Sequence, residues 1–137
     1  MDNQTPDRRS AGSRPPMTTI STIGVTMDCP DPELAATFWE TFLNYRRRPS
    51  KPDQPYVTIE RPEGSDGLAL VTFQRVPEPK TTKARLHLDL FVDHAQLILE
   101  AMIDAGATAV HTIPAGEWTT RVLQDPAGNE FCVIGPD

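Results

Sequence analysis

The central part of the chain alternates apolar and polar residues with a period of two. Between residues 84 and 92, leucine or valine occupies every second position, and Arg85, His87, Asp89 and Phe91 lie between them. This alternation predicts a strand that packs one face against apolar neighbours. The other face brings a histidine and an aspartate into the same space, which makes it the start of a candidate binding site.

Two helices are predicted from apolar residues at helical spacing. The first covers residues 31–43 and opens with an Asp-Pro pair, which suits an N-cap followed by the first helical position. Its Phe38 and Trp39 are expected to anchor the core. The second helix follows the central strand and ends at Gly106. Each helix can cover one face of a sheet.

Short segments rich in apolar and β-branched residues predict strands, and clusters of proline, glycine and aspartate between them predict turns. The turns are expected at residues 62–67, 114–116 and 125–129. The strands are expected at residues 18–29, 45–48, 56–60, 68–76, 84–92, 108–111, 118–123 and 130–134. The resulting order is strand, helix and three strands, followed by the same order again, which is an internal repeat of about 55 residues.

The repeat divides the chain into two modules. The first module spans residues 18–76, the second spans residues 84–137, and a linker with two prolines joins them over residues 77–83. Residues 1–17 are polar and offer almost nothing to bury, so we expect a disordered tail. Met17 is an alternative translation start.

Each predicted module has one helix, which can cover only one face of its sheet. The two uncovered faces are expected to meet across a cleft. We therefore predict an α+β fold in which two tandem βαβββ modules form a curved, partly open mixed sheet around a central cleft.

Composition narrows the classes of partner. The chain has 137 residues, a net charge of −6 and 38% hydrophobic residues, which suits a soluble domain without nucleic-acid binding. No apolar run reaches the length of a membrane span. Cys29 and Cys132 make no disulfide framework, so we expect a reduced, cytoplasmic setting.

Several motifs resemble those of the vicinal-oxygen-chelate superfamily, which includes glyoxalases, bleomycin-resistance proteins and extradiol dioxygenases. The resemblance runs from residue 18 to the end of the chain, is most specific at the Asp-Pro-x-Gly-Asn turn, and lies nearest to small glyoxalase-like proteins. It implies the two-module fold described above. The motifs are VTMDCPDP at 25–32, Phe38-Trp39, FQRV at 73–76, LHLDL at 86–90 and LQDPAGNEF at 123–131.

The same resemblance implies a divalent metal held by four side chains, one from each of four strands. In this chain the four positions fall on Gly24, near Gln74, on His87, and on Cys132, with Glu130 two residues earlier on the same strand face. Such a site suits Zn, Ni, Fe or Mn. Because glycine offers no ligand, this set favours a protein without a resident cofactor. A metal held by His87 and Glu130 is the alternative.

The predicted cleft face mixes hydrogen-bonding groups with aromatic rings, as a small-molecule pocket requires. Histidine is the side chain best suited to proton transfer at neutral pH, which makes His87 the candidate catalytic acid or base. A purely structural interpretation also stands, in which His87 pairs with its aspartate neighbour and the aromatic rings only pack. The candidate ligand-binding residues are Thr26, Gln74, Asp89, Phe91, Trp118 and Cys132.

Three functions remain open from the sequence. The incomplete ligand set favours a small-molecule binding protein that sequesters an aromatic or antibiotic-like compound. The second is a metal-dependent lyase, isomerase or dioxygenase that uses His87 and Glu130, and the third is a metal-free enzyme with His87 as general base. A homodimer is the expected assembly, since symmetric dimers are the commonest.

Overall fold

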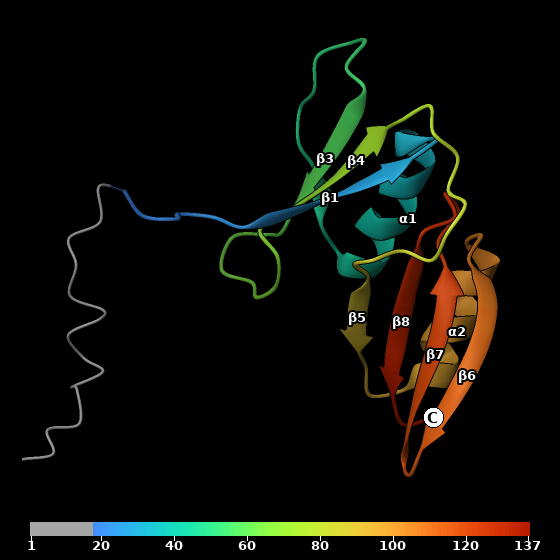
Figure 1. Ribbon diagram of the computed structural model, residues 1–137. Coiled ribbons are helices and arrows are strands. Elements are labelled where there is room, and N and C mark those ends of the chain that lie inside the picture. Colours follow the sequence, from blue (N-terminus) through green and yellow to red (C-terminus); the bar gives the residue numbers. More distant parts are fainter. Residues whose placement is uncertain (1–17) are drawn as a thin grey trace, which may run out of the picture.

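The computed structural model describes residues 18–137, which form two four-stranded sheets and two helices (Figure 1). The predicted disordered tail, residues 1–17, and the alternative start Met17 lie outside the described residues. No helix in the described part of the chain is long and apolar enough to cross a membrane.

The first module forms a mixed sheet with the strand order β1-β4-β3-β2. Strand β1 runs parallel to β4, and the other neighbours are antiparallel. The elements of this module are β1 (Gly24–Cys29), α1 (Pro32–Leu43), β2 (Arg46–Arg47), β3 (Tyr56–Glu60) and β4 (Leu70–Arg75).

The second module repeats this arrangement, with the strand order β5-β8-β7-β6 and with β5 parallel to β8. The repeat and the α+β fold of two βαβββ modules are therefore confirmed, and both sheets are mixed and open. The elements are β5 (Leu88–Phe91), α2 (Ala95–Asp104), β6 (Thr108–Ala115), β7 (Trp118–Gln124) and β8 (Glu130–Gly135).

Helix α1 begins where the sequence predicts it to begin. The Asp31 carboxylate accepts a hydrogen bond from the Leu34 amide at 3.2 Å, and Pro32 occupies the first turn. The helix ends at Asn44, which adopts the left-handed conformation with φ 55°. An asparagine tolerates this conformation better than most side chains, so it stops the helix cleanly.

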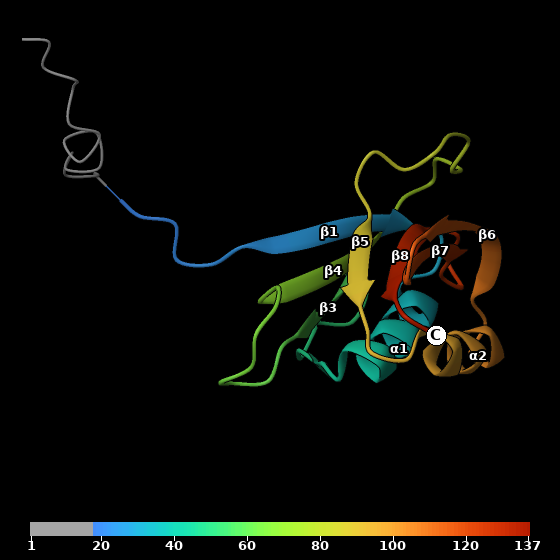
Figure 2. The same cartoon turned by 90° about the horizontal axis from the view of Figure 1, so that it is seen from below.

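Both modules share one hydrophobic core. Phe131 of β8 is fully buried, and its ring lies 4.9 Å from that of Trp39 and 5.9 Å from that of Phe38, both on α1. Helix α1 therefore packs against the second module as well as its own sheet. Figure 2 shows both helices on one side of the molecule. We call the face of each sheet that no helix covers its open face.

The Asp-Pro-x-Gly-Asn turn joins the two modules. Asp125 is 3% exposed, and its carboxylate accepts hydrogen bonds from the Trp39 indole at 2.8 Å and from the amides of Ala127 and Asn129 at 2.9 and 3.0 Å. The side-chain amide of Asn129 (Nδ2) in turn donates to the Asp28 carbonyl of β1 at 3.0 Å. Through these hydrogen bonds the motif holds α1 and β1 against the second sheet.

The central strand is shorter than predicted. The sequence predicts a strand over residues 84–92, whereas β5 begins at Leu88, the first residue paired with β8. The main chain of Ala84 instead lies near the Glu130 carboxylate, where it helps to lower the pKa of that group. Because these residues leave the sheet, Leu86 is 65% exposed, and the prediction that it packs in the core was wrong.

The predicted turn at residues 114–116 was also placed too early. Strand β6 continues through Pro114 to Ala115, although the sequence predicts a strand only over residues 108–111. Since β6 is the outer strand of its sheet, a proline interrupts no second ladder there. At the other end of the fold, β1 begins at Gly24, six residues later than predicted.

Candidate functional site

The open face of the second sheet gathers three side chains that can bind a metal. Asp89 of β5 lies beside Cys132 of β8 in the parallel register, and His87 precedes β5. The His87 Nε2 atom lies 3.1 Å from an Asp89 carboxylate oxygen. One ligand atom from each of the three residues lies within 4.8 Å of the others. We call these three residues the donor group.

The electrostatics of the donor group suit ligation better than covalent catalysis. Burial raises the pKa of the Cys132 thiol, the Asp89 carboxylate raises it further, and the charge of Lys83 opposes the shift. A thiol with a raised pKa is a weak nucleophile at neutral pH. A metal ion can nevertheless displace the proton of the Cys132 thiol. The nitrogen, oxygen and sulfur ligands of the donor group then fit a zinc site with three protein ligands and one open position.

Two exposed aromatic residues lie farther along the same open face. Phe91 follows Asp89 by two residues, which places it on the same side of β5 at a distance of about 7 Å along the strand. Its ring centroid is 6.5 Å from that of Trp118 on β7. Phe91 is 70% exposed and Trp118 is 49% exposed. Exposed aromatic pairs of this kind are typical of binding surfaces.

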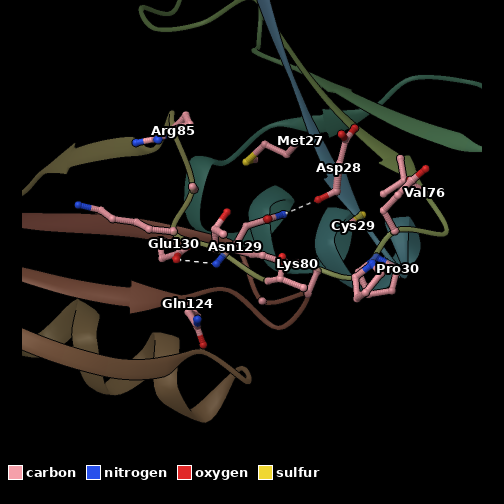
Figure 3. Close-up of a pocket in the computed structure, with 18 of the residues that line it drawn as sticks. Met27, Asp28, Cys29, Pro30, Val76, Lys80, Arg85, Gln124, Asn129 and Glu130 are labelled. Carbon is pink, nitrogen blue, oxygen red and sulfur yellow. Dashed lines mark hydrogen bonds and ion pairs between the residues drawn. The ribbon is translucent and has the colours of Figure 1, made fainter.

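Glu130 is engaged by the linker rather than by the donor group. Its Oε1 atom accepts a hydrogen bond from Lys80 Nζ at 2.7 Å (Figure 3). Burial alone would raise the pKa of Glu130, but the hydrogen bond and charge of Lys80 and the nearby main chain outweigh it and lower the pKa below its usual value. The donors around His87 are therefore Asp89 and Cys132.

A cavity of about 1050 Å³ lies between the end of β1, the Asp125 turn and residues 77–86 (Figure 3). We call residues 77–86 the strap. Thr26 and Glu130 line this cavity, whereas the donor group and the aromatic pair do not. Burial raises the pKa of its only thiol, Cys29, to about 11, so that thiol is unreactive at neutral pH.

The sequence profile of the glyoxalase-like domain matches residues 24–134. The chain belongs to the glyoxalase-like domain family. No curated protein matches the chain significantly.

Solved structures share the fold of this glyoxalase-like protein at low sequence identity. A glyoxalase/bleomycin resistance protein/dioxygenase family enzyme from Burkholderia phytofirmans PsJN superimposes with a TM-score of 0.64 at 17% identity, over 82% of this chain and 95% of that one. A fosfomycin resistance protein from Mesorhizobium loti superimposes with a TM-score of 0.61 at 15% identity, over 87% and 95%. At these identities the likeness shows the fold alone.

The first sheet of this glyoxalase-like protein contributes no metal ligand at the position that the resemblance implies. Gly24 lies beside Leu70 on β4, and a Cβ atom added there would lie 3.0 Å from the Leu70 carbonyl oxygen. The position therefore has no side chain, and a Cβ atom there would require Leu70 to move by a few tenths of an ångström. Gln74 lies on the open face of the first sheet, between Asp28 and Tyr56 on its two neighbouring strands.

The structure splits the candidate residues of this glyoxalase-like protein into three locations. Gln74 stays with the first sheet, and Thr26 and Glu130 line the cavity. Five others share the open face of the second sheet. The sequence does not predict that Lys80 pairs with Glu130, because a lysine in an irregular linker leaves no periodic signal. The residues on the second sheet are His87 with Asp89, Phe91, Trp118 and Cys132.

Proposed function

We propose that this glyoxalase-like protein binds a small aromatic molecule on the open face of its second sheet. The observation that carries the proposal is the exposed pair Phe91 and Trp118, which lies beside a group of hydrogen-bonding side chains. Aromatic rings prefer tilted or offset neighbours, and the 57° angle between these two leaves ring surface for a third. A protein that binds an aromatic or antibiotic-like compound in this way can sequester it, and no chemical reaction is needed.

Replacing Phe91→Ala is expected to weaken binding of aromatic compounds about tenfold, because one aromatic contact is worth about 1 kcal/mol beyond its buried area. The measurement is calorimetric titration with catechol, indole and phenylacetate. The control is Tyr56→Ala, which removes a partly exposed ring from the first sheet. The proposal fails if none of these compounds binds the unaltered protein, or if both variants lose affinity equally.

A metal-dependent function is the second candidate, and the donor group favours it. His87, Asp89 and Cys132 would hold the ion, and the thiolate among them favours zinc. The bound ion would act as a Lewis acid toward ligand oxygen atoms. Without a metal, His87 beside the Asp89 carboxylate is placed to accept a proton from a ligand bound at the aromatic pair.

His87→Ala is expected to reduce zinc or nickel affinity at least about 100-fold, since even indirect supporting residues are worth about 10- to 100-fold. Metal content is measured by elemental analysis after reconstitution, and affinity by calorimetry. His111→Ala, which removes an exposed histidine from β6, is the control. Glu130→Ala should retain the metal if Asp89 and Cys132 complete the site. A protein that takes up no metal would leave the binding function and the metal-free function of His87.

We further propose a homodimer located in the cytoplasm. The support for the dimer is β6, the outer strand of its sheet, where Val110 and Ile113 are each 49% exposed and can be covered by a second copy. The support for the location is that Cys29 and Cys132 are both free thiols. Sedimentation at several protein concentrations tests the dimer, and a mass equal to one chain at all of them would contradict it.

A further inference from the structure

We propose that the cavity beside the strap is a second binding site, which takes an uncharged molecule with an apolar body and a hydrogen-bond donor, and that the Glu130 carboxylate accepts this hydrogen bond. The site is separate from the open face of the second sheet and does not depend on the function proposed above. Three observations support it, namely the size and position of the cavity, a buried oxygen atom of Glu130, and the exposed side chain of Leu86.

The cavity has the size of a ligand pocket. Its volume is about 1050 Å³, close to the upper limit of small-molecule pockets, which range over about 300–1,000 Å³. In Figure 2 the strap lies on the side of the two sheets away from the helices. It belongs to neither sheet, since β4 ends at Arg75 and β5 begins at Leu88. The strap can therefore shift to admit a molecule without breaking a pair of strands.

Glu130 has an oxygen atom that no donor reaches. Its side chain is 15% exposed, and Oε1 accepts a hydrogen bond from Lys80 Nζ at 2.7 Å. The other oxygen, Oε2, is buried and has no hydrogen-bond partner among residues 18–137. Buried polar atoms are nearly always paired, because an unpaired one costs free energy. Since Glu130 lines the cavity, a hydroxyl or amide group of a bound molecule can supply the donor once the strap shifts.

The charges around the cavity balance, which favours an uncharged ligand. The acidic residues of its lining are Asp28, Glu78 and Glu130, and the basic ones are Lys80, Lys83 and Arg85. Lys80 already neutralises Glu130. An ammonium group of a ligand at Oε2 would place two cations beside one carboxylate, and a carboxylate group there would be repelled by Glu130. A neutral donor avoids both costs.

The lining of the cavity also includes apolar surface that remains in water. Leu86 lines the cavity and is 65% exposed, although covering a leucine side chain is favourable. Met27 and Val76 add further apolar lining. A molecule with an apolar body would cover Leu86 while its donor group meets Glu130.

The test compares borneol with camphor, which has the same carbon skeleton but a ketone in place of the hydroxyl and therefore no donor. Neither compound is aromatic or charged, which separates this site from the aromatic pair. Calorimetric titration should show that the unaltered protein binds borneol at least about tenfold more tightly, because hydrogen bonds to charged groups are the strong ones. Glu130→Gln should remove this preference, since an amide can donate to the ketone as well as accept from the hydroxyl.

Three further variants locate the site. Leu86→Asn changes an exposed residue and leaves Glu130 in place. It should weaken the binding of both compounds about threefold, close to the effect of uncovering one methylene group. Phe91→Ala should change neither affinity. Glu78→Gln, which removes another acid of the cavity lining, should keep the preference for borneol.

Each part of the proposal can fail separately. Equal affinity of the unaltered protein for borneol and camphor would overturn the role of Glu130, and so would a preference that survives in Glu130→Gln. Tighter binding of bornylamine, a cation on the same skeleton, would overturn the assignment of an uncharged ligand. Loss of borneol binding in Phe91→Ala would place the compound on the open face instead. If neither compound binds, the second site fails, and the aromatic site is unaffected. Should Glu130→Gln not fold, the comparison in the unaltered protein and in Leu86→Asn still decides.

Discussion

Phe131→Ala is expected to lower the free energy of unfolding by about 3–5 kcal/mol, as large-to-small changes of buried aromatic residues do. Phe131 is fully buried and contacts both Phe38 and Trp39 on the helix of the other module. The substitution therefore leaves a cavity where the two modules meet. The measurement is urea denaturation, followed by circular dichroism and by tryptophan fluorescence.

The matched control for this change is Phe91→Ala. Phe91 is on the same sheet but is 70% exposed, so its loss is expected to change the stability by less than about 0.5 kcal/mol. Because one core serves both modules, circular dichroism and fluorescence should report a single transition in both variants. Two separate transitions in the unaltered protein would contradict the shared core. Similar stability losses in the two variants would contradict the burial of Phe131.

Asp125→Ala is expected to lower the free energy of unfolding by about 2–4 kcal/mol. The change leaves the Trp39 indole and the amides of Ala127 and Asn129 without their acceptor. Each buried donor that loses its partner costs about 1–3 kcal/mol, although the part-buried turn amides can recover some of this from water. Urea denaturation measures the loss.

A double-mutant cycle isolates the contact between the modules. Trp39→Phe removes the indole donor and retains most of the ring, and its coupling with Asp125→Ala is expected to be about 1 kcal/mol or more. Asp31→Ala is the control, because Asp31 also accepts a main-chain hydrogen bond but lies at an exposed helix start, where its loss costs about 1 kcal/mol. If the stability losses of the Trp39 and Asp125 changes simply add in the double mutant, the hydrogen bond between the two side chains does not stabilise the protein.

The elements that follow from the sequence are those determined by neighbours in the sequence. Helix α1 has its cap, its proline and its apolar spacing within residues 31–44, so its bounds are predictable. The start of β5 is different. It depends on the path of the strap, which the ion pair between Lys80 and Glu130, 50 residues apart, holds beside β8. No local pattern contains this information.

The candidate site is likewise predictable only in the part that depends on neighbours in the sequence. The alternation around the central strand places His87, Asp89 and Phe91 on one side, and the structure keeps the three on that side. That Cys132 joins His87 and Asp89, while Glu130 turns to Lys80, depends on the register between β5 and β8 and on the path of the strap. Register and linker path are tertiary properties, which single positions do not encode.

Gly24 has a consequence for the evolutionary routes open to this chain. A histidine introduced there would bring its Cβ to within 3.0 Å of the Leu70 main-chain oxygen, an atom that no substitution at Leu70 can remove. Placing a ligand on the first strand would therefore require two paired strands to separate slightly as well as a mutation. A metal ligand is thus more easily added on the second sheet than at this position of the first.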